Sequence, residues 1–259
     1  MSTRPALPSR LRATRSSVTA GSGIGRLRKA GVAWAYGARR AARKAAAGLA
    51  ALALLSGPAV AEPVTIAALG DSLTQGYGLP PEDGFVPQLQ AWLQGQGADA
   101  AILNAGVSGD TTAGGLARIG WTLTDEVDAL IVALGGNDAL RGLDPAEARA
   151  NLDAILGEAG ARDLPVLLVG IGAPGNFGPD YRAAFEAIYR DLAATHDTLL
   201  VRDFLAPIVA QADRAAARAA YMQADGLHPN ADGVALIVAE MGPAVLALID
   251  RTAAAHGSD

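Results

Sequence analysis

Five short apolar runs recur between residues 62 and 259, and longer stretches of helical character separate them. The runs span residues 64–69, 101–103, 129–134, 166–171 and 198–201. Unbroken apolar runs are typical of strands that are buried on both faces, as they are in a parallel sheet. Because helical stretches alternate with these strands, the pattern predicts a three-layer α/β/α domain with right-handed crossovers.

The stretches between the runs carry apolar residues three or four positions apart, a spacing that places them on one face of a helix. We expect helices over residues 85–93, 146–161, 181–194 and 232–249. Neither a linker nor an internal repeat interrupts residues 62–259. We therefore expect this part of the chain to form a single domain.

Charge is divided unevenly along the chain. Residues 1–61 contain eleven basic residues and no acidic one, whereas residues 62–259 contain all 26 acidic residues and ten Arg, which gives that segment a net charge of −16. A segment this acidic repels phosphate backbones, so we expect it to bind no nucleic acid.

The basic stretch leads into an apolar segment, residues 45–55, which is followed by Ser56, Gly57, Pro58 and the small residues 59–61. This order of charged, apolar and small residues is typical of a secretory signal peptide. We expect cleavage after Ala61 and a periplasmic or secreted mature chain. Eleven apolar residues are too few to cross about 30 Å of hydrocarbon, so we expect no membrane span after processing. An uncleaved anchor and a basic disordered arm are the alternatives.

The rarity of Cys and His limits the chemistry open to this chain. It contains no Cys and only three His, at positions 196, 228 and 256. These counts exclude disulfides, iron–sulfur clusters, thiolate zinc sites and a Cys nucleophile. Residues 170–175 match the dinucleotide pattern G-x-G-x-x-G, but Pro174 interrupts the helix that should follow. We expect neither a metal nor a cofactor, and we interpret this segment as a loop near the functional site.

Glycines and polar residues follow the apolar runs, at the sheet edge where open parallel sheets form their binding sites. Ser72 follows the first run, and a serine becomes a nucleophile when a base deprotonates it. His228 is the best candidate base, because His196 ends a predicted helix and His256 lies in a polar tail. Asp225 precedes His228 by three residues, so one turn can present both in the manner of a Ser-His-Asp triad.

Acyl transfer also requires hydrogen-bond donors that face the developing oxyanion. Gly109 can present its backbone N–H from the loop after the second run, and Asn137 can present a side-chain amide from the loop after the third. We interpret Asp71 as a structural or capping carboxylate. Asp110 and Asp138 are interpreted as residues that support loops.

Four blocks of the sequence resemble, in order, the four blocks of the SGNH (GDSL) hydrolases. They are Gly70-Asp71-Ser72-Leu73, Gly109 within Val-Ser-Gly-Asp-Thr, Gly-Gly-Asn137-Asp138, and Asp225-Gly-Leu-His228-Pro. The similarity covers nearly all of residues 62–259. It is greatest to the bacterial periplasmic thioesterase I/protease I/lysophospholipase L1 group and its arylesterase relatives.

This resemblance implies a flavodoxin-like fold with a five-stranded parallel sheet and a carboxylic ester hydrolase that acts through a covalent acyl-enzyme. Ser72 would be the nucleophile, His228 the base and Asp225 the residue that orients it. The Ser72 N–H, the Gly109 N–H and the Asn137 side chain would form the oxyanion hole.

The substrates implied by this group are small acyl esters or lipid esters, and we expect Leu140 and Phe177 to contact the acyl chain of a monomeric enzyme. A carbohydrate O-deacetylase with the same fold is the first alternative, although aromatic residues, at 5%, are few for a sugar platform. The second is a non-catalytic binding module. It predicts the loss of at least one of the five matched positions, and all five are present.

Overall fold

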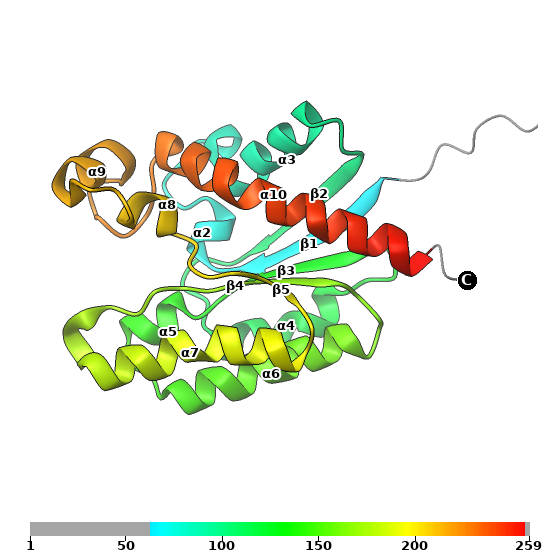
Figure 1. Ribbon diagram of the computed structural model, residues 1–259, viewed down its shortest axis with the longest axis horizontal. Coiled ribbons are helices and arrows are strands. Elements are labelled where there is room, and N and C mark those ends of the chain that lie inside the picture. Colours follow the sequence, from blue (N-terminus) through cyan, green and yellow to red (C-terminus); the bar gives the residue numbers. More distant parts are fainter. Residues whose placement is uncertain (1–62, 257–259) are drawn as a thin grey trace, which may run out of the picture. The chain divides into compact units, whose positions relative to one another are not determined.

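A five-stranded parallel sheet in the order β2-β1-β3-β4-β5 lies at the centre of the fold (Figure 1). The structure is a computed structural model that describes residues 63–256. Its strands are β1 (Val64–Gly70), β2 (Ala100–Gly106), β3 (Ala129–Ala133), β4 (Val166–Val169) and β5 (Leu199–Val201). All four neighbouring pairs are parallel. This strand order is that of flavodoxin-like folds, so the expected α/β architecture is confirmed.

Helices cover both faces of the sheet. Figure 1 shows α3 (Phe85–Gly95) and α10 (Ala231–His256) on one face, and α4 (Thr112–Thr122), α6 (Pro145–Gly160) and α7 (Pro179–Thr195) on the other. Every residue of β3 is buried, as are all four residues of β4. Burial on both faces explains why these strands consist of unbroken apolar runs.

The structure corrects two predicted strand ends. β2 continues to Gly106 rather than ending at residue 103, and β4 ends at Val169 rather than at residue 171. β2 lies at the edge of the sheet, where Asn104 is exposed, so a polar residue does not end the strand there. An apolar run therefore marks the position of a strand better than it marks its end.

Several helices were not predicted from the sequence. α4 contains Gly114, Gly115 and Gly120, which weaken its helical pattern. A Cβ on Gly115 would collide with Leu134, so the helix needs this glycine to approach the sheet. The others span at most eight residues, too few to show a period: α2 (Ser72–Gln75), α5 (Gly136–Leu140), α8 (Ala206–Val209), α9 (Arg214–Tyr221), and the 3₁₀ turns η1 (Pro81–Asp83) and η2 (Gly175–Phe177).

Within residues 63–256, α10 is the one helix that is long and apolar enough to cross a membrane. It packs on α3 and on the sheet, and 44% of its most apolar stretch is buried inside the fold. The predicted signal peptide, residues 1–61, and the cleavage site after Ala61 lie outside the described residues.

Candidate active site

Ser72 is the first residue of α2 and follows β1 after a single intervening residue. That residue, Asp71, caps the helix by accepting a hydrogen bond from the Leu73 N–H at 3.0 Å. A Cβ on Gly70 would collide with the Thr74 side chain, so only glycine permits so sharp a turn between strand and helix. The turn presents the Ser72 hydroxyl at the carboxyl end of the sheet, where ligands bind in this class of fold.

Asp225 and His228 belong to one turn of the loop that precedes α10. The Asp225 carboxylate accepts hydrogen bonds from the backbone N–H groups of Leu227 and His228, at 2.9 and 3.1 Å. Gly226 has φ +65°, a conformation that suits glycine. The Tyr77 ring packs against the imidazole, with ring centroids 4.6 Å apart. Both side chains are therefore held in place before any ligand binds.

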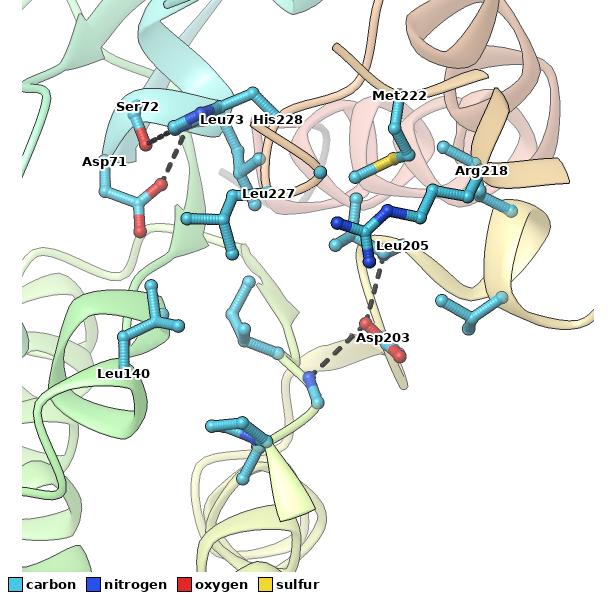
Figure 2. A pocket seen from close by; sticks show the side chains of 18 of the residues that line it. Asp71, Ser72, Leu73, Leu140, Asp203, Leu205, Arg218, Met222, Leu227 and His228 are labelled. Carbon is cyan, nitrogen blue, oxygen red and sulfur yellow. Dashed lines mark hydrogen bonds between the residues drawn. The ribbon is translucent and has the colours of Figure 1, made fainter. Parts of the chain in front are cut away.

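Two short hydrogen bonds join this turn to Ser72, which lies 156 residues earlier in the chain. His228 Nδ1 lies 2.7 Å from Asp225 Oδ2. His228 Nε2 lies 2.8 Å from Ser72 Oγ, and Figure 2 shows this second hydrogen bond. The hydrogen bond from His228 and those from the two backbone N–H groups lower the pKa of Asp225 to about 2. The ionised carboxylate accepts a hydrogen bond from the Nδ1–H of His228, which leaves the Nε2 lone pair directed at the Ser72 hydroxyl.

Gly109 and Asn137 approach the same sheet edge from two other loops. Gly109 has φ +81°, and no described residue accepts a hydrogen bond from its N–H. The Asn137 amide donates to the Asp110 carbonyl at 2.8 Å and to Asp71 Oδ2 at 3.4 Å. The second bond is long, so that hydrogen is held loosely and is available to another acceptor.

Asp71 is buried, with an exposed fraction of 2%. Burial raises its pKa to about 6, although the bond from Leu73 and the nearby His228 act in the opposite direction. The residue caps α2, as expected from the sequence. Asp138 accepts two hydrogen bonds from Thr112, and Asp110 forms an ion pair with Arg118 at 2.7 Å, so both support loops, also as expected.

A cavity of about 580 Å³ extends from Ser72 toward α8 and α9. The residues that line it include Leu140, as predicted, but not Phe177. The Phe177 ring packs against Tyr181, at 5.2 Å between centroids, and lies over Gly142. A contact between Phe177 and the acyl chain thus stays a prediction, and the cavity does not support it.

The far part of the cavity was not anticipated. Its lining residues come mainly from α8, α9 and the two loops beside them: Leu205, Ile208, Val209, Arg214, Ala217, Arg218, Met222 and Leu227. α8 and α9 have four and eight residues, too few for a periodic signal. Among residues 63–256, no three His, Cys, Asp or Glu side chains are grouped in a way that suits a metal ion.

Comparison with known proteins places this geometry in a family. Residues 68–236 match the GDSL-like Lipase/Acylhydrolase family. Esterase TesA of Pseudomonas aeruginosa is 43% identical over 183 residues, which cover 70% of this chain and 87% of the relative. Thioesterase 1/protease 1/lysophospholipase L1 of Escherichia coli K12 is 34% identical over 188 residues, which cover 72% of this chain and 86% of the relative.

Solved structures agree with these sequence matches. The crystal structure of TesA superimposes with a TM-score of 0.64 at 38% identity and covers 71% of this chain and 99% of its own. The structure of AlinE4, an SGNH-hydrolase family esterase, has a TM-score of 0.59 at 44% identity, with coverage of 73% and 97%. The chain belongs to the GDSL-like lipase/acylhydrolase family and is a carboxylic ester hydrolase.

Proposed function

We propose that the protein hydrolyses acyl esters through a covalent acyl-enzyme formed on Ser72. The observation that carries this proposal is the pair of short hydrogen bonds that joins Asp225 to His228 and His228 to Ser72. As Ser72 Oγ bonds to the acyl carbon, His228 Nε2 takes the hydroxyl proton. His228 then gives this proton to the leaving oxygen or sulfur as its bond to carbon breaks.

Deacylation repeats the same steps with water as the nucleophile. His228 takes a proton from the water as its oxygen bonds to the acyl carbon, and returns it to Ser72 Oγ as the acyl-serine bond breaks. In both steps the carbonyl oxygen becomes an oxyanion. The Gly109 N–H, the Ser72 N–H and the Asn137 amide would stabilise it, and the loosely held second hydrogen of Asn137 supports that role.

We propose small acyl esters and lipid esters as the substrates. Leu140 and Ile171 lie on the wall next to Asn137 and present apolar surface to the acyl chain. None of the residues that line the cavity is Phe, Tyr or Trp, so the cavity lacks the aromatic platform that a sugar O-deacetylase would use. The lining therefore favours lipid esters over acetylated carbohydrate.

We further propose that the mature protein is a periplasmic or secreted monomer that needs no metal or cofactor. The order of basic, apolar and small residues in residues 1–61 supports export. N-terminal sequencing of the protein expressed with its native leader should find Glu62 as the first residue. An intact leader on a cytoplasmic protein would contradict the proposed location.

A series of p-nitrophenyl esters with acyl chains of increasing length, assayed with the wild type and Ser72→Ala, tests the proposed activity. The variant should fold normally and lose at least about 10³-fold in kcat, because the attacking atom is gone. An active-serine phosphonate should modify Ser72 and no other residue. Full activity in Ser72→Ala would overturn the proposal.

A further inference from the structure

The far part of the cavity has a charge opposite to that of the domain around it. Residues 62–259 carry 26 acidic residues and only ten Arg. Three of those ten Arg line this one cavity, Arg182, Arg214 and Arg218, whereas only two of the acids do, Asp71 and Asp203. This concentration of guanidinium groups gives the cavity of an acidic protein a local charge that favours a ligand of negative charge.

Arg214 and Arg218 are available to such a ligand. They lie one turn apart on α9, and neither guanidinium forms a hydrogen bond or ion pair with any residue in the described part of the chain. Arg182, in contrast, is paired with Glu186 at 2.8 Å. Figure 2 shows Arg218 extending into the cavity beside Met222 and Leu205, so its five N–H donors face the space that a ligand would occupy.

The position of Arg218 indicates which part of the ester it faces. A Cβ on Gly226 would collide with the Arg218 guanidinium, so this group lies against the turn that carries His228. His228 Nε2 delivers its proton to the leaving oxygen, so the alcohol of the ester lies on the side of this turn. In Figure 2, Leu140 and Arg218 lie on opposite sides of Leu227. The acyl chain is proposed to bind on the side of Leu140.

We propose that Arg214 and Arg218 form an anion subsite that selects esters whose alcohol part carries a negatively charged group. This inference rests on the proposed function, and it adds a substrate class that the triad alone does not specify. Guanidinium groups bind carboxylate and phosphate oxygens through charge-assisted hydrogen bonds. The apolar side chains of Leu205, Met222 and Leu227 would cover the adjoining uncharged part of the same alcohol.

A matched pair of chromogenic esters tests the subsite. One is the octanoate ester of 3-hydroxy-4-nitrobenzoic acid, whose leaving phenol carries a carboxylate, and the other is its neutral methyl ester. The measured quantity is the ratio of kcat/KM for the acid to kcat/KM for the methyl ester. Comparing this ratio between variants cancels the different intrinsic reactivities of the two esters.

The double variant Arg214→Gln/Arg218→Gln should lower this ratio about tenfold while the methyl ester is still hydrolysed. Raising the salt concentration should lower the wild-type ratio in the same direction, because exposed charges are screened. Arg149→Gln/Arg190→Gln is the matched control. It removes the same total charge from exposed positions on α6 and α7, and it should leave the ratio unchanged.

A single variant and a second pair of esters test the subsite independently of the double variant. Arg214→Gln alone leaves the Arg218–Gly226 contact intact and should lower the ratio about threefold even if the double variant folds poorly. The p-nitrophenyl monoester of suberic acid, with its methyl ester, carries the charge on the acyl side and should show no dependence on the two arginines.

An unchanged ratio in the double variant, an equal loss in the control, or a loss confined to the suberate pair would overturn the subsite. Failure of the proposed function would give a different result. If the protein is not a Ser72 ester hydrolase, neither ester of either pair would be hydrolysed through Ser72.

Discussion

The wall of the cavity that carries Ser72 and Asn137 consists of strand ends and the first turns of α2 and α5, whereas the opposite wall consists of α8, α9 and their loops. On the first wall, buried Asp71 and Asp138 hold the backbone through hydrogen bonds. On the second, Val209 is half exposed and Arg214 and Arg218 have no described partner. We therefore expect the first wall to supply the chemistry and the exposed wall to face the variable part of the substrate.

From this difference between the walls we predict that the largest losses in kcat follow removal of the hydrogen bonds that hold the turn of Asp225 and His228. Asp225→Asn should lower kcat by up to about 10⁴-fold, because the amide no longer fixes the Nδ1 proton of His228. Because the pKa of Asp225 is about 2, this carboxylate is ionised from pH 4 upward. Steady-state kinetics of the wild type and the variant at pH 7 therefore compare the ionised carboxylate with the neutral amide, and an unchanged kcat would argue against Asp225 as the residue that orients His228.

The next largest effect should come from the oxyanion donor on the same wall. Asn137→Ala removes a hydrogen bond that strengthens in the transition state, so kcat should fall about 10²–10³-fold while KM changes little. Steady-state kinetics with one p-nitrophenyl ester are sufficient to measure both constants. A change in KM alone would reassign Asn137 to the binding of the ground state.

Replacing each of two buried aspartates on this wall by asparagine should change the free energy of unfolding in opposite directions. The pKa of Asp71 is raised from 3.8 to about 6, so the folded protein holds a proton that the unfolded chain has released. Asp71 therefore makes the wild type less stable as the pH rises from about 4 to about 6. Asp71→Asn cannot ionise and can still cap α2, so it should gain about 1–3 kcal/mol of unfolding free energy at pH 8 and almost none at pH 3.

Asp138→Asn is the matched control, because Asp138 is equally buried at 2% exposure. Both of its oxygens accept hydrogen bonds from Thr112, and an amide can replace only one of them, so this variant should be less stable at neutral pH. Denaturant unfolding at the two pH values measures both variants. Equal losses for the two at pH 8 would contradict the loss of stability assigned to the ionisation of buried Asp71.

The smallest effects on kcat/KM should come from Leu140 and Phe177, the two residues that were predicted to contact the acyl chain, and the two should differ. Each buried CH₂ contributes up to about 0.8 kcal/mol, and Leu140 is 48% exposed, so Leu140→Ala should lower kcat/KM for octanoate about fivefold and for acetate hardly at all. Phe177→Ala should change the dependence on chain length less, because Phe177 lies outside the cavity. The reverse order would restore the contact that the sequence suggested for Phe177.

The sequence predicted the first wall well, because its residues directly follow buried strands. Ser72, Gly109 and Asn137 could be placed at one sheet edge from the apolar runs alone, and the spacing of Asp225 and His228 placed both in one turn. The second wall could not be predicted, since α8 and α9 are too short to show a period. The contact expected for Phe177 stays a prediction, and an apolar residue in a glycine-rich loop can pack on a neighbour such as Gly142 instead of facing a ligand.

The 156 residues between Ser72 and His228 have a consequence for the timing of synthesis. The proposed nucleophile is among the first residues of the domain to be made, and the proposed base is among the last, just before α10. Until the chain beyond residue 228 has emerged and packed, Ser72 is an ordinary serine with no base to activate it. On the proposed mechanism, ester hydrolysis is therefore a property of the finished chain, and a nascent or truncated chain that ends before this turn would not hydrolyse esters through Ser72.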